Sequence, residues 1–173
     1  QLTDKDKEER KALASKIHFE CQGLSNVDCS DRKKEYSAFA LDYAYTDEGA
    51  KALGERGHYS VILAEASESV ITTDYRALID IRNDDVSWAI GTKGELINVN
   101  GFREFAHEIT HLAYDNDEKN TMEVTNRIIH QNEILKTGNA SMAGVRRFYK
   151  TKSLARAKWG IHGVKPDLTI GER

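Results

Sequence analysis

A five-residue stretch, His107-Glu108-Ile109-Thr110-His111, constrains this chain more than any other feature of its sequence. Residues four positions apart lie on one face of a helix, so two histidines at this spacing can bind one zinc ion. The glutamate beside the first histidine can take a proton from a water at the open metal position. The stretch therefore predicts a helix that carries two metal ligands, His107 and His111, and a general base, Glu108.

The residues around this stretch favour a helix that is buried on one side. The segment 102–114 is free of proline, and Asn100-Gly101 just before it supplies a helix start signal. Its apolar residues recur at three- and four-residue steps, as in a core-facing helix. They are Phe102, Phe105, Ala106, Ile109, Leu112 and Ala113. The alternative interpretation is an ordinary amphipathic helix with two exposed histidines.

A catalytic zinc site needs three protein ligands, and the residues alone leave the third one open. Asp117 has the spacing of the third ligand in the metzincin pattern, although Tyr114 stands where that pattern has a glycine. Glu123 lies one turn into a second predicted helix and can complete the set if the two helices pack together. Its alternative is an ion pair on a solvated face. Glu118 and Glu133 are weaker candidates.

The other elements are predicted from cap and turn signals and from hydrophobic periodicity. We expect a first helix over 3–22, a loop over 23–35, a short helix from Thr46 and a long helix over 121–136. Short segments rich in strand-forming residues predict strands. These segments are 59–64, 70–73, 77–81, 88–90 and 95–99. The pattern predicts an α+β protein with a small mixed or antiparallel sheet before the motif helix.

Length and composition fit one core-forming domain of 173 residues. The net charge of −3 gives no reason to expect a nucleic-acid partner, and no apolar run is long enough for a membrane span. The chain begins with Gln1 and lacks an apolar signal segment, so we expect a processed form or a domain of a longer polypeptide. Cys21 and Cys29 can form a disulfide or remain free thiols.

Several segments resemble the NleD-type family of bacterial effector zinc metallopeptidases. They are a Thr-x-x-Gly-x-x-x-Leu element, a turn and strand before Ala-His-Glu-x-x-His, a Glu-x-x-Thr-like element and a terminal Arg-x-x-Tyr. In this chain they are residues 46–53, 94–99 with 106–111, 122–125 and 146–149. Leu112 stands where the family usually has alanine, and the Thr-Val-Gly that often follows the glutamate is not present.

The resemblance implies a zincin-like metallopeptidase core over 42–150, with an N-terminal helix and loop over 1–41 and a tail over 151–173. It favours Glu123 as the third zinc ligand. It also implies that Tyr149 donates a hydrogen bond to the oxyanion formed during peptide hydrolysis. A substrate would add a strand at the edge of the sheet, beside residues 95–99.

By the same resemblance, we expect a soluble zinc endopeptidase that a bacterium secretes or translocates into a target cell. Its partners would be a protein substrate and, for a toxin domain, an immunity or inhibitor protein. Two alternatives stay open. One is a metzincin-like peptidase that uses Asp117, and the other is a non-catalytic zinc-binding toxin or interaction module.

Overall fold

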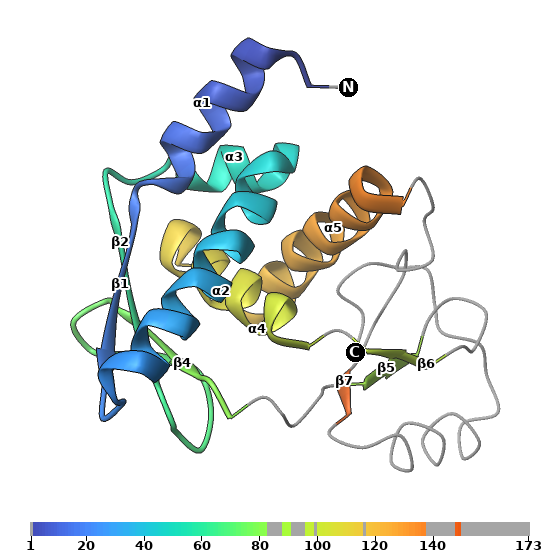
Figure 1. Ribbon diagram of the computed structural model, residues 1–173. Coiled ribbons are helices and arrows are strands. Elements are labelled where there is room, and N and C mark those ends of the chain that lie inside the picture. Colours follow the sequence, from blue (N-terminus) through green and yellow to red (C-terminus); the bar gives the residue numbers. More distant parts are fainter. Residues whose placement is uncertain are drawn as a thin grey trace, which may run out of the picture.

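A computed structural model of the chain describes residues 2–82, 88–90, 96–98, 100–115, 117–137 and 148–149. These residues form an α+β structure with five helices, shown in Figure 1. The helices are α1 (Asp4–Ala14), α2 (Asn26–Tyr45), α3 (Asp47–Leu53), α4 (Asn100–Tyr114) and α5 (Glu118–Thr137). Among them, none combines the length and the apolar content that a membrane span requires.

The main sheet has four strands in the order β1-β2-β4-β3. Strands β1 (Ile17–Gln22), β2 (Tyr59–Ala64) and β4 (Ala77–Asp80) are parallel, and β3 (Val70–Ile71) pairs antiparallel with β4 at one edge. A second, antiparallel sheet has the order β6-β5-β7. Its strands are β5 (Trp88–Ile90), β6 (Leu96–Asn98) and β7 (Phe148–Tyr149). All five predicted strands are present, and the main sheet is mixed.

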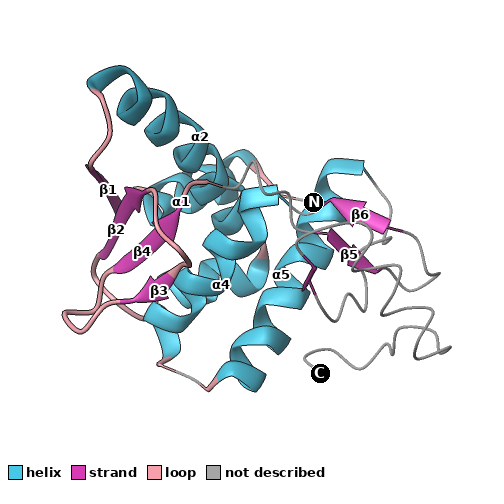
Figure 2. Cartoon of the chain, turned by 90° about the horizontal axis from the view of Figure 1, so that it is seen from below, coloured by secondary structure: helices cyan, strands magenta, loops and turns pink. Residues whose placement is uncertain are grey.

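One face of the main sheet packs against α2 and α4, as Figure 2 shows. Alternate strand residues, such as Val61 and Leu63 of β2, point into this layer and are fully buried. The ring of Phe105 of α4 packs in this layer, with its centroid 6.0–6.3 Å from the centroids of four aromatic rings of β1 and α2. The segment 102–114 is helical, and the apolar stripe predicted for it is buried along its whole length.

The first predicted helix is wrong over its second half. Helix α1 starts after the Thr3 cap, as expected, but it ends at Ala14. Residues 17–22 instead pair along their whole length with β2, and Ile17 and Phe19 pack in or against the core. Strand pairing with a distant segment therefore outweighs the helix-like spacing of apolar residues.

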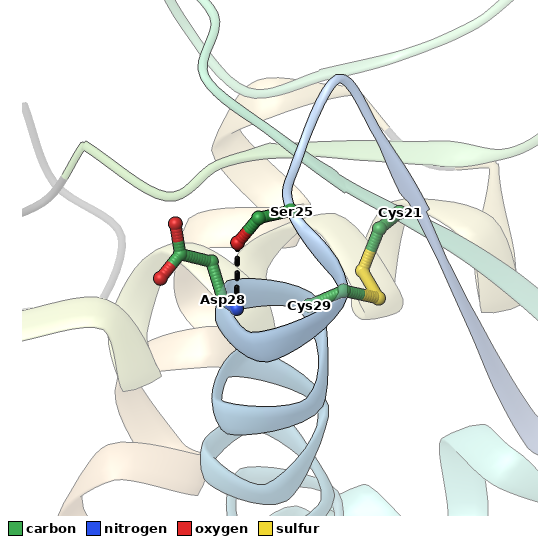
Figure 3. The surroundings of a disulfide bond; sticks show 4 residues. All are labelled: Cys21, Ser25, Asp28 and Cys29. Atoms are coloured by element: carbon green, nitrogen blue, oxygen red, sulfur yellow. Dashed lines mark hydrogen bonds between the residues drawn. A yellow bond between two sulfur atoms is a disulfide. The ribbon is translucent and has the colours of Figure 1, made fainter.

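The loop predicted over 23–35 is also wrong, because α2 begins at Asn26. The Ser25 hydroxyl accepts a hydrogen bond from the backbone N–H of Asp28 at 3.1 Å, which caps the helix (Figure 3). A disulfide joins Cys21 at the end of β1 to Cys29 in the second turn of α2. The segment from Cys21 to Cys29, here called the β1–α2 corner, thus ties the sheet edge to the helix that covers it.

Candidate metal centre

Helix α4 presents the two motif histidines to one side, because its apolar stripe fixes which side faces the core. The His107 and His111 rings lie with their centroids 4.7 Å apart, nearly perpendicular to each other. Their side chains are 13% and 17% exposed, so both are largely covered but reachable. Glu108, between them in sequence, is buried.

A carboxylate from the next helix meets both imidazoles. Glu118 is the first residue of α5, and its Oε1 lies 3.2 Å from His107 Nε2 and 2.5 Å from His111 Nε2. One ligand atom from each of the three residues lies within 4.8 Å of the other two. Two imidazole nitrogens and a carboxylate oxygen at this separation could hold one metal ion.

The turn between the helices explains why Glu118 arrives there. Asp115 follows α4 with a φ of 52°, the left-handed backbone that reverses the chain. The Asp117 carboxylate then accepts the N–H of Asn120 at 2.8 Å, as an N-cap does. The segment from His111 to Glu118, here called the α4–α5 corner, therefore folds the start of α5 back over the last turns of α4, and the two helices lie side by side (Figures 1 and 2).

The two histidines differ in what their Nδ1 atoms contact. The Thr121 hydroxyl lies 3.2 Å from His111 Nδ1 and is itself buried. Such a partner fixes the ring orientation and leaves Nε2 free to bind a metal. The Nδ1 of His107 is buried and has no hydrogen-bond partner within the described part of the chain. This atom stands on the side of the ring away from the Glu118 contact, since Nε2 makes that contact.

The charge states of these groups suit metal binding and proton transfer. Burial, followed by the positive charge of Arg103, lowers the pKa of His107 to about 4, so its ring is neutral at pH 7. Burial, followed by the negative charges of Glu118 and Glu104, raises the pKa of Glu108 to about 8. For Glu118, partial burial raises the pKa, but the nearby His107 and His111 lower it more, so the pKa of this carboxyl group lies below its usual value.

The centre opens into a cleft of about 310 Å³ between the β3 edge of the sheet and the α4–α5 corner. Its lining residues come from the β3 region, the following turn, α4 and the corner. They are Ser69, Val70, Ile71, Tyr75, Glu108, His111, Asp115 and Glu118. A ligand in this cleft would contact Glu108 and two members of the metal-binding group at once.

A larger hollow of about 540 Å³ lies between the start of α2 and the ends of β2 and β4. It is lined by acidic and basic residues together, and one of its arginines, Arg32, pairs with Glu35 at 3.2 Å. The described residues that line it include no histidine. Its carboxylates are partly neutralised within the chain, so size alone does not make it the chemical centre.

The structure brings His107 and His111 together and places Glu108 in the same cleft as His111, but the carboxylate at the histidines is that of Glu118. Glu123 is half-buried on α5 and is not in the group. Five residues separate it from Glu118, which corresponds to about 140° around a helix. The side chain of Tyr149 lies outside the described residues, although its backbone forms part of β7.

The sequence holds a signal for Glu118 that the prediction did not use. Helix α5 starts at Glu118, three residues before the predicted start at 121. Asp117 has the residue type of an N-cap, and Glu118 has the acidic character favoured in a first helical turn. A helix begun there, after so short a turn, places its first residue opposite the end of α4.

Comparisons with known proteins give no assignment. No model of a known protein family matches the chain, and a search of curated proteins finds no match.

Proposed function

We propose that this chain is a zinc-dependent endopeptidase with a zincin-like fold. The observation that carries the proposal is the grouping of His107, His111 and Glu118, of which His111 and Glu118 line one cleft together with Glu108. Two histidines and one glutamate are a ligand set of catalytic zinc sites, which keep one position open for water or substrate. Glu118 replaces Glu123 as the proposed third ligand, because its carboxylate already meets both imidazoles.

Glu108 is the proposed general base. Zinc, when bound, lowers the pKa of water and polarises a carbonyl group. Glu108 lines the cleft next to His111, so its carboxylate can take the proton from the attacking water and pass it to the departing amine. Burial raises the pKa of Glu108, which makes its carboxylate a stronger proton acceptor than an exposed one.

The substrate is proposed to lie along β3. This strand is the edge of the main sheet, and Val70 and Ile71 line the same cleft as Glu108. An extended peptide can pair with the free backbone groups of such an edge, which positions its carbonyl groups without regard to sequence. Strand β3 therefore takes the place of residues 95–99 in the expected mode of substrate binding.

The resemblance to NleD-type peptidases supports the further proposal of a secreted bacterial effector or toxin domain acting on a protein substrate. The disulfide between Cys21 and Cys29 supports export, because such bonds persist in oxidising surroundings and are rare in the cytosol. An immunity or inhibitor protein that covers the cleft would be a natural partner of a toxin domain.

The test compares zinc-loaded wild type with Glu108→Gln on a proteome-derived peptide library, with new N-termini read by mass spectrometry. We expect one zinc per chain in both proteins and new N-termini only with wild type. Cleavage should stop when zinc is removed by a chelator. Glu9→Gln on α1, at an exposed position far along the chain from the motif, is the matched control and should cleave like wild type.

Three results would change the proposal. Full cleavage by Glu108→Gln would remove Glu108 from the reaction. Zinc binding by a wild type that cleaves nothing would favour the non-catalytic module. A wild type that binds no zinc would overturn the proposed function as a whole.

A further inference from the structure

Two residues with an unusual backbone meet at the candidate cleft. Among the described residues other than glycine, Tyr75 and Asp115 alone have a positive φ, 59° and 52°. Both line the cleft that holds Glu108 and Glu118. L-residues rarely adopt this conformation, and such residues gather at functional sites, where the surrounding structure holds them in place. Their common location calls for a joint explanation.

Hydrogen bonds within its turn hold the backbone of Tyr75. The N–H of Tyr75 donates to the Thr72 carbonyl at 3.0 Å, and the N–H of Thr72 donates to the Arg76 carbonyl at 2.8 Å. The Asp74 carboxylate accepts from both the Thr72 hydroxyl and the Arg76 guanidinium. Tyr75 itself is 65% exposed, so its ring adds little to the core. The turn thus presents an aromatic ring at the rim of the cleft.

Asp115 lines the same cleft and directly follows the last residue of α4. Its N–H donates to the His111 carbonyl at 2.9 Å, which anchors its backbone one turn from a proposed zinc ligand. The residue is exposed, and its carboxylate has no hydrogen-bond or ion-pair partner among the described residues. Among the described residues that line the cleft, none is a lysine or an arginine. Asp115 is therefore a free negative charge facing the space that the substrate would enter.

We propose that Tyr75 and Asp115 form a subsite for a long basic side chain, lysine or arginine, next to the scissile bond of the substrate. This inference rests on the proposed peptidase function and names the substrate class of that same cleft. A cation is attracted to the face of an aromatic ring and forms a charge-assisted hydrogen bond with a carboxylate. An apolar side chain would instead cover the Asp115 carboxylate without pairing it, and an acidic one would meet like charge.

The first measurement maps cleavage sites of zinc-loaded wild type in a peptide library. Lysine and arginine should be enriched within two positions of the cut. The best-cleaved peptide is then made with lysine or norleucine at that position, and kcat/KM should favour lysine by about tenfold, the size of an ion pair combined with a cation–π contact. Capture of the same library on immobilised zinc-loaded Glu108→Gln gives a second readout that needs no turnover.

Three variants test separately what the Asp115 charge, the Tyr75 ring and the Tyr75 hydroxyl contribute to the lysine preference. Asn tolerates a positive φ, so Asp115→Asn removes only the charge and Tyr75→Asn removes the ring without straining the turn. Each should reduce the lysine preference to about twofold, whereas Tyr75→Phe should keep it. Asp31→Asn on α2, an exposed position outside the cleft, is the matched control and should keep the full preference.

The outcomes are distinguishable from those of the proposed function. Cleavage without enrichment of basic residues, or a lysine preference unchanged in Asp115→Asn, would overturn the subsite and leave the peptidase proposal standing. Neither cleavage nor zinc-dependent capture of peptides would overturn both.

Discussion

The β1–α2 corner and the α4–α5 corner solve the same geometric problem with different chemistry. In each, a side chain before the second element caps a helix: the Ser25 hydroxyl in the first, the Asp117 carboxylate in the second. In each, a link between two side chains closes the segment. The first link is a disulfide, and the second is the contact of His111 with Glu118.

The two links differ in what they leave available. A disulfide uses the bonding capacity of both sulfur atoms, so the β1–α2 corner is a structural tie. The α4–α5 link joins groups whose lone pairs remain able to bind a metal, and Glu118 is 69% exposed at the cleft. A short closed segment is therefore no guide to function by itself. The donor atoms that close it, and the space they face, distinguish a tie from a ligand set.

The largest expected effect concerns the α4–α5 corner. Glu118→Ala should lower zinc affinity by at least about 100-fold, because losing a residue that merely hydrogen-bonds to a metal ligand already costs about 10- to 100-fold in affinity. Glu123→Ala and Asp117→Asn should change it by no more than about threefold, as surface changes do. Competition with a chromophoric chelator measures all three. A large loss in Glu123→Ala, with Glu118→Ala unaffected, would make Glu123 the ligand after all.

The next effect concerns the β1–α2 corner. Replacing both Cys21 and Cys29 with serine should lower the free energy of unfolding by about 2–3 kcal/mol, the chain-entropy value for a closed segment of this length. Urea denaturation measures the change, with wild type in reductant as the parallel sample. Zinc affinity should stay within about threefold of wild type, since the metal-binding group lies on other elements. A comparable loss of zinc binding would show that the two corners are coupled.

The smallest effect concerns the caps that the two corners share. Ser25→Ala and Asp117→Ala should each lower the free energy of unfolding by about 1 kcal/mol, because a helical N–H loses its partner. Asp117→Asn should lower the free energy of unfolding by only about 0.3 kcal/mol, since asparagine caps a helix as well as aspartate does. Thermal unfolding with and without zinc measures both. A stability loss in Asp117→Asn as large as in Asp117→Ala would mean that the carboxylate charge acts beyond the cap.

The same contrast shows how far prediction from sequence reached. The interval between His107 and His111 and the buried stripe through Phe105 are local patterns, and both lie on α4 as predicted. Strand β1 was missed because its stability comes from β2, with Ile17 opposite Tyr59, more than forty residues later. Glu123 was preferred because the family resemblance favoured it and because a predicted helix start at residue 121 left Glu118 in a loop, whereas α5 begins at Glu118.

The sequence by itself determined which groups on one helix can act together, His107, Glu108 and His111, because helix geometry alone sets the direction of residues at that spacing. Only the tertiary structure decided which carboxylate meets the two imidazoles, whether Cys21 and Cys29 form a disulfide, and which strand borders the cleft. Each of these depends on where the chain reverses. The points of reversal are set by the backbone conformation of single residues such as Asp115 and by pairing between strands, such as β3 with β4.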